Sequence, residues 1–122
     1  MRAREGLPVD AAIERALATL GWEGSQVEVE DTFPRRLLGF TVRPMMTRDR
    51  RPLVLAFPRC RSVHTCFMRF PLDIAFVSGE GEVLLFASNV APWRFVCAEG
   101  ELVLERATCF SPPFDVDGAT SS

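Results

Sequence analysis

Several residue types and patterns are missing from the sequence, and each absence removes a class of protein. Among 122 residues there is no lysine and no tyrosine, and there is one histidine. Apolar residues run together for about five positions at most, as in Leu53–Phe57, whereas a membrane-spanning helix needs roughly 20. The first arginines are not followed by an apolar segment, so no export signal is visible. We therefore expect a single cytoplasmic domain with no membrane span.

The common catalytic and cofactor motifs are also absent. No P-loop, Gly-x-Ser-x-Gly or Gly-x-Gly-x-x-Gly sequence occurs, so the sequence predicts neither a phosphate-binding loop nor a hydrolase nucleophile turn. The four cysteines include no Cys-x-x-Cys pair. In a reducing compartment they are expected to be free thiols. We expect no cofactor.

Charge is distributed unevenly along the chain. All 14 basic residues are arginines, and with 16 acids the net charge is −2. Nine arginines lie between Arg35 and Arg69 with a single acid, Asp49, whereas eight acids and two arginines follow from Phe70 onward. This asymmetry either neutralises itself across the fold or gathers a positive patch on one surface. Because nucleic-acid-binding domains are usually basic overall, a nucleic-acid partner is not expected.

The hydrophobic pattern predicts a mainly β fold. Residues 9–20 have the spacing of an amphipathic helix that Gly21 ends, and a second short helix is expected over 31–39. Short strand-like segments then recur, with a Ser-Gly-Glu-Gly turn at 78–81. We expect a mainly antiparallel β-sandwich or barrel with one or two short N-terminal helices. The expected strands are 26–30, 53–57, 60–67, 73–77, 82–87, 94–97 and 101–105.

Cys60, His64 and Cys66 form a Cys-x3-His-x-Cys pattern whose three positions have the same parity. On one extended strand their side chains share a face, where two thiolates and an imidazole are able to begin a metal site. The same parity adds Met68 and Phe70, which makes that face apolar and favours unreactive buried cysteines. The alternative of a metal- or thiol-site protein stays open beside this structural interpretation.

The single histidine raises a second alternative, a hydrolytic enzyme that uses His64 and Asp73. Asp73 is the acid nearest to His64 along the chain, and a general base needs a carboxylate to orient it. A lone histidine in an apolar strand is more often a hydrogen-bonded structural residue. An aspartate at a turn that enters a strand commonly accepts backbone N–H groups. We therefore favour a non-catalytic role.

The opposite parity of the same segment carries three arginines around an aromatic side chain. Arginines in this setting suit bidentate contacts with phosphate or carboxylate groups. Exposed arginines that only increase solubility are the alternative. The expected ligand is an anionic small molecule or an acidic protein segment. The candidate binding residues are Arg59, Arg61, Arg69, Asp73, Trp93 and Arg94.

The segment Ser62–Val77, which reads Ser-Val-His-Thr-Cys-Phe-Met-Arg-Phe-Pro-Leu-Asp-Ile-Ala-Phe-Val, resembles the signature of the family known as domain of unknown function 192 (DUF192). The segments 36–40, 89–94 and 102–105 are similar to other parts of that family, so the likeness covers roughly residues 26–107. The resemblance implies a compact β-sandwich or barrel of jelly-roll type with small helices. It implies no activity.

This sequence departs from the commonest family pattern at one place. Many members have Trp-Met-x-Asn-Thr where residues 64–68 read His-Thr-Cys-Phe-Met, as in a branch associated with high-GC bacteria. Residues 1–25 are expected to form an N-terminal helical extension, 26–111 the β domain, and 112–122 a flexible tail. From the sequence we expect a non-catalytic binding or accessory module.

Overall fold

The computed structural model describes residues 8–30, 39–41 and 43–111. These residues form one α-helix, seven strands and two short 3-10 helices. In chain order the elements are α1 (Val9–Leu20), β1 (Gln26–Val29), η1 (Gly39–Thr41), β2 (Leu53–Pro58), β3 (Ser62–His64), β4 (Leu72–Val77), β5 (Val83–Val90), β6 (Phe95–Cys97), β7 (Leu102–Ala107) and η2 (Thr108–Phe110).

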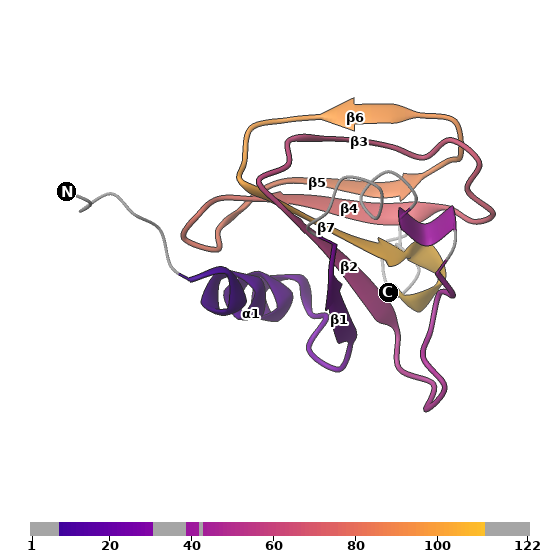
Figure 1. Cartoon of the computed structure of the whole chain (residues 1–122), viewed down its shortest axis with the longest axis horizontal. Helices are drawn as coiled ribbons and strands as arrows, with labels where there is room; N and C mark the ends of the chain where they lie inside the picture. Colours follow the sequence, from indigo (N-terminus) through magenta and orange to yellow (C-terminus); the bar gives the residue numbers. More distant parts are fainter. Residues whose placement is uncertain (1–7, 31–38, 42, 112–122) are drawn as a thin grey trace, which may run out of the picture.

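The strands form two open sheets packed face to face, which confirms the expected mainly β, sandwich-like fold. The larger sheet has the order β1-β2-β7-β4-β5, and the smaller one pairs β3 with β6. Figure 1 shows three layers, with the β3–β6 sheet on one side of the larger sheet and α1 on the other. All strand pairs are antiparallel except β1 and β2, which run parallel, so the larger sheet is mixed.

The helix has the bounds that the sequence predicts. Gly21 ends α1 in the left-handed conformation with φ of 76°, and its amide donates to the carbonyl oxygen of Ala18. Asp10 lies in the first turn, where a negative charge favours the helix dipole, and the N-cap residue is Pro8, which makes no side-chain capping hydrogen bond. Ile13 and Leu17 pack against the larger sheet, and Trp22 folds back onto the same core.

Every residue of β2, β4 and β7 is buried, because both faces of the larger sheet are covered. Alternate residues therefore enter two different cores. One core lies under α1 and includes Val54, Ala75 and Leu104. The other lies under β3 and β6 and includes Leu55 and Phe76. This double coverage explains the continuous apolar runs in the sequence.

The expected strand 60–67 is wrong in its length. Only Ser62–His64 is extended, and Arg59 and Phe67 on either side have positive φ values of 55° and 65°, which lie outside the range of regular strand backbone. The turn at 78–81 is confirmed, with Gly81 at φ of 88°. The expected helix over 31–39 falls outside the described residues except at Gly39, and the expected tail 112–122 falls wholly outside them. In the described part of the chain no helix is long and apolar enough to cross a membrane.

Candidate binding site

Two connections meet at one end of the sandwich, at the right in Figure 1: the one between β3 and β4 and the one between β5 and β6. Thr65, which is fully buried, joins them. Its amide donates to the carbonyl oxygen of Arg94 at 2.9 Å, and its own carbonyl oxygen accepts the amide of Trp93 at 3.0 Å. Its hydroxyl donates to the carbonyl oxygen of Ala91 at 2.7 Å and accepts the amide of Arg94 at 2.8 Å. One side chain thus fixes the path of both connections.

Each connection carries an aromatic residue in a strained backbone conformation. Phe67 has φ of 65° and Trp93 has φ of 66°, values that bulky residues seldom adopt. Such residues cost of order 1–3 kcal/mol each and persist where the surrounding structure enforces them, commonly at binding sites. Here the hydrogen bonds around Thr65 enforce them.

The two aromatic rings contact each other and remain open to solvent. Their centroids are 4.7 Å apart in an edge-to-face arrangement, with Phe67 67% and Trp93 60% exposed. Phe95, two residues beyond Trp93 and paired with His64 across β3 and β6, is 71% exposed. We call Phe67, Trp93 and Phe95 the aromatic surface. Fixed, exposed aromatic rings of this kind are more typical of an interaction site than of a scattered surface residue.

The two connections that carry the aromatic surface contain arginines and no acids. Residues 65–71 include Arg69 and residues 91–94 include Arg94, with no aspartate or glutamate in either. Arg94 is exposed beside Trp93. Arg69 is held in place instead, because its Nη2 donates to the carbonyl oxygens of Phe40 at 3.3 Å and Arg43 at 3.1 Å. Both arginines are exposed, and Arg69 is the one whose guanidinium is held by backbone carbonyl oxygens.

The structure divides the arginines that the sequence groups together. The connection between β2 and β3, which contains Arg59 and Arg61, lies at the opposite end of the sandwich from the connections that contain Arg69 and Arg94 (Figure 1, left). Arg59 and Arg61 line an open pocket of about 540 Å³ together with Ser78, three glutamates and neighbouring residues. The three arginines predicted to share one strand face do not do so, because β3 spans only Ser62–His64. The glutamates of the pocket are Glu80, Glu99 and Glu101.

Asp73 is not part of any surface. Its carboxylate is fully buried, and Oδ1 accepts the amide of Asn89 at 2.9 Å and the hydroxyl of Thr108 at 2.7 Å. Oδ2 accepts the hydroxyl of Ser111. The residue opposite it in β7 is Arg106, whose pKa is lowered by burial against the opposing effect of the Asp73 charge. Asp73 thus anchors the end of β5 and the 3-10 turn that follows β7.

The pairing of His64 with Asp73 that a hydrolase needs is not formed. His64 Nδ1 accepts the amide of Cys66 at 3.2 Å. Asp73 has the parity of Ala75, whose side chain enters the core under α1, and so lies on the far side of the larger sheet from β3. The Asp73 oxygens accept hydrogen bonds from other groups, so His64 and Asp73 do not form a catalytic pair.

The proposed metal ligands do not converge either. Cys60 precedes β3, and its thiol donates to the carbonyl oxygen of Ser62 at 3.2 Å, while Cys66 follows the strand. Within the described residues, no group of three His, Cys, Asp or Glu side chains is placed to hold a metal ion. All four cysteines are free.

Glu105 is one of two buried acids, with Glu30, that sequence reasoning missed. Glu105 lies in β7 between Leu55 and Ile74 of the neighbouring strands and is 4% exposed. Burial raises its pKa to about 8. In the described part of the chain its carboxyl group has neither a hydrogen bond nor an ion pair. Thr65 and Phe67 were missed too, since their roles depend on contacts with a segment more than 20 residues away.

A profile of the DUF192 family, described as "Uncharacterized ACR", matches residues 16–109. The chain belongs to the DUF192 family. The family profile overlaps the second half of α1, which packs on the sheet.

Two solved structures share the fold of this DUF192 protein. One is a protein of unknown function from Novosphingobium aromaticivorans, with a TM-score of 0.58 and 22% identity over 71% of this chain and 66% of that one. The chain thus spans slightly less than two thirds of that relative. The other, from Sinorhizobium meliloti, is described as a proposed transcription regulator, with a TM-score of 0.57 and 22% identity over 68% of each chain. No curated protein matches the sequence.

Proposed function

We propose that this DUF192 protein is a non-catalytic binding module, and that its aromatic surface, with Arg94, docks an acidic segment of a partner protein. The observation that supports this most is the contact between Phe67 and Trp93. Both rings are exposed, both are held at positive φ, and they lie 4.7 Å apart. A fold that maintains two strained, exposed aromatics is organised around something that contacts them.

The chemistry of this end favours a protein segment as the ligand. Tryptophan and arginine dominate the binding energy of protein interfaces, and acids are depleted at their centres. Rings that are already fixed lose little conformational entropy on binding. The arginines and the absence of acids favour a partner with carboxylates, and the rings favour one with apolar side chains between them.

The two tryptophans make a direct test possible. Trp22 is buried and Trp93 is exposed, so their indole N–H signals in a nitrogen-15 NMR spectrum report on the core and on the aromatic surface separately. The probe is a 15-residue peptide of glutamate, aspartate, leucine and phenylalanine. We expect it to move the Trp93 signal, to leave the Trp22 signal unchanged, and to lose its effect when lysines replace its acids.

Variants locate the binding. Trp93→Ala is expected to abolish the peptide-induced shifts of the backbone amides around Thr65. The double variant Arg59→Gln with Arg61→Gln, at the other end of the sandwich, is expected to retain them. No response to millimolar peptide, or a response centred on Arg59 and Arg61, would overturn the proposal. Stronger binding of a thymidine oligonucleotide than of the acidic peptide would replace it with a nucleic-acid partner.

A small-molecule ligand is a second candidate, supported by the pocket that holds Arg59 and Arg61. Because three glutamates line the same pocket, we propose that a ligand there carries an anionic and a cationic group. Phosphoethanolamine, which has both, is expected to raise the melting temperature at concentrations where phosphate alone does not. The Arg59→Gln with Arg61→Gln variant is expected to lose this effect. Equal shifts from the two compounds, or equal shifts in parent and variant, count against the pocket.

A further inference from the structure

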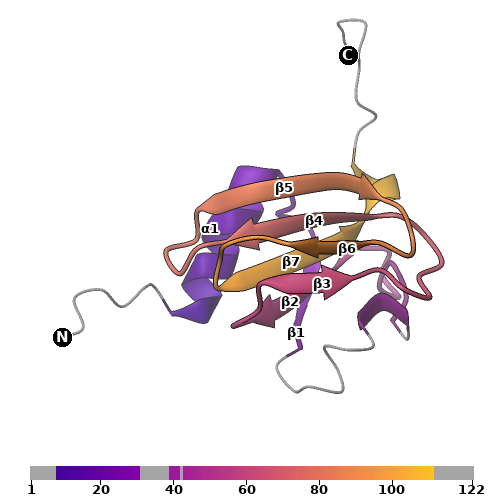
Figure 2. The same ribbon diagram turned by 90° about the horizontal axis from the view of Figure 1, so that it is seen from above.

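The outer strand of the larger sheet is unusually apolar for a free edge. β5 is the last strand in the order β1-β2-β7-β4-β5, and none of its eight residues is charged. Figure 2 shows it along the rim of the sandwich, outside β3 and β6. Three consecutive large side chains are exposed: Leu84 by 48%, Leu85 by 43% and Phe86 by 43%. No other described strand pairs with its outer side.

The exposed side chains cover both faces of the strand. Phe86 lies opposite Ala75 and Leu85 opposite Phe76 in the pairing with β4. Ala75 belongs to the core under α1 and Phe76 to the core under β3 and β6. A strand added beside β5 would therefore extend both apolar faces of the sheet at once.

Free edges are normally protected by charged residues, proline or a very short strand. The opposite edge of the same sheet has such protection: β1 has four residues, and Glu28 within it forms an ion pair with Arg43 at 2.8 Å. β5 has twice the length and no charge. Its pairing with β4 shifts register at two places, between Phe76 and Val77 and again near Asn89, which has φ of 56°, so the regular part of this edge is Leu85–Ala87.

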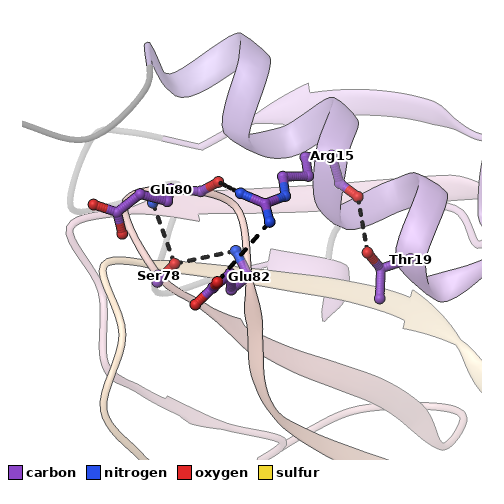
Figure 3. Close-up of polar contacts among 5 residues, drawn as sticks. All are labelled: Arg15, Thr19, Ser78, Glu80 and Glu82. Carbon is purple, nitrogen blue, oxygen red and sulfur yellow. Dashed lines mark hydrogen bonds and ion pairs between the residues drawn. The ribbon is translucent and has the colours of Figure 1, made fainter.

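The first end of β5 is held rigidly on α1. Arg15 of the helix donates to the carbonyl oxygen of Glu80 at 2.9 Å and lies 3.9 Å from the Glu82 carboxylate. Ser78 Oγ accepts the amides of Glu80 and Glu82, as Figure 3 shows. Gly81 fits against the helix, since a Cβ there would lie 2.9 Å from the carbonyl oxygen of Ala12. A strand edge fixed in this way loses little conformational entropy when another strand pairs with it.

We propose that β5 is a self-association surface, at which β5 of a second copy of this chain adds antiparallel about a twofold axis. Strand-to-strand pairing of this kind is isologous, so the same apolar residues meet from both sides. Charge favours the antiparallel direction. The chain before β5 carries Glu80 and Glu82, and the chain after it carries Arg94 and no acid up to Cys97. Because Glu82 already lies 3.9 Å from Arg15, Glu80 is the acid that Arg94 of the second copy would approach at each end.

Sedimentation velocity of the full chain, from 5 to 300 µM, tests the proposal. We expect a monomer–dimer equilibrium in the parent, and a rise of at least tenfold in the dimer dissociation constant for Leu85→Lys. The matched control is Val29→Lys, which places the same charge at the other edge of the sheet and is expected to leave the equilibrium unchanged. Circular dichroism confirms that both variants keep the fold.

A charge-pair experiment tests the twofold arrangement itself. Leu85→Lys and Leu85→Glu are each expected to be monomeric, and an equimolar mixture is expected to regain dimers, because antiparallel copies bring the middle of each β5 together. A parent that stays monomeric to 300 µM overturns the proposal. So does a Leu85→Lys variant that dimerises like the parent, or a mixture that stays monomeric.

Discussion

Thr65 and Arg94 hydrogen-bond to each other in both directions. The amide of Thr65 donates to the carbonyl oxygen of Arg94 at 2.9 Å, and the amide of Arg94 donates to Thr65 Oγ1 at 2.8 Å. Because Thr65 is fully buried, water is not available to replace either bond. The positions of Phe67 and Trp93, and with them the aromatic surface, depend on this pair.

Replacing the Thr65 hydroxyl tests that dependence. Thr65→Val keeps the shape of the side chain but leaves the Arg94 amide and the Ala91 carbonyl without their partner. We expect the free energy of unfolding to fall by about 1–3 kcal/mol. We also expect the Trp93 indole N–H signal to broaden or shift while the Trp22 signal stays in place. Urea unfolding and nitrogen-15 NMR measure the two effects.

Thr65→Ser is the matched control, because serine retains the hydroxyl and loses only a methyl group. It is expected to leave the Trp93 signal unchanged and to cost less stability than Thr65→Val. If the two variants disturb Trp93 equally, packing rather than hydrogen bonding fixes the loops.

The strained backbone at Trp93 predicts an unusual result for a tryptophan-to-glycine change. Trp93→Gly removes the contact with Phe67, worth about 0.5–1.5 kcal/mol, but glycine accepts the positive φ without strain. We expect the free energy of unfolding to change by less than about 1 kcal/mol. The acidic peptide is expected to bind no longer. Trp93→Gly is thus expected to lose peptide binding while it keeps most of its stability.

Trp22 provides the contrast within the same chain. It is buried, and the Arg106 guanidinium lies 4.7 Å from its ring centroid. Trp22→Ala is expected to cost about 3–5 kcal/mol. A large destabilisation by Trp93→Gly, comparable to that of Trp22→Ala, would show that Trp93 supports the fold rather than a ligand.

The sequence predicted the elements that are determined by residues within them or next to them. Gly21 ends α1 because it accepts a left-handed conformation, and the 78–81 turn forms for the same reason at Gly81. The apolar run at Leu53–Phe57 identified a buried strand. Sequence could not indicate that β1 pairs parallel with β2, since that contact joins segments separated by about 25 residues.

The candidate site was harder to predict because its geometry comes from breaks in regular structure. The parity argument grouped Arg59, Arg61 and Arg69 on one strand, and positive φ at Arg59 and Phe67 interrupts that strand. Trp93 and Arg94 were among the candidate binding residues predicted from the sequence. Phe67 was noted only as the aromatic residue beside the arginines, because its contact with Trp93 depends on how the two connections meet.

Thiol reactivity tests the burial of the four cysteines. Cys97 and Cys109 are exposed, whereas Cys60 and Cys66 are half-buried, and all four are free. With an aromatic disulfide reagent, the native protein is expected to release two equivalents quickly and two slowly. Unfolded protein under non-reducing conditions is expected to release four at once. A total of two or none in the unfolded protein would reveal disulfides and contradict the expected cytoplasmic location.

The raised pKa of Glu105 predicts that the free energy of unfolding falls as the pH rises. Its pKa is raised by burial from an ordinary value of 4.5 to about 8, so the folded chain holds a proton that the unfolded chain releases. The stabilisation is complete below pH 4.5 and is lost as the pH rises to about 8. The free energy of unfolding is expected to decrease by several kcal/mol across that interval. Urea unfolding at a series of pH values measures it.

Glu105→Gln isolates this effect from every other titrating group. Glutamine has nearly the same shape and stays neutral, so the variant is expected to match the parent near pH 4.5 and to be the more stable protein at pH 8. The difference between the two curves removes contributions such as that of Asp49, whose pKa is lowered by its hydrogen bond with Thr47. If the plots of unfolding free energy against pH stay parallel for the parent and Glu105→Gln from pH 4.5 to pH 8, the Glu105 carboxyl group is ionised in the folded protein at neutral pH. Its position between Leu55 and Ile74 would then require a cationic or hydrogen-bonding partner, and Glu105→Gln would lower stability at pH 8 instead of raising it.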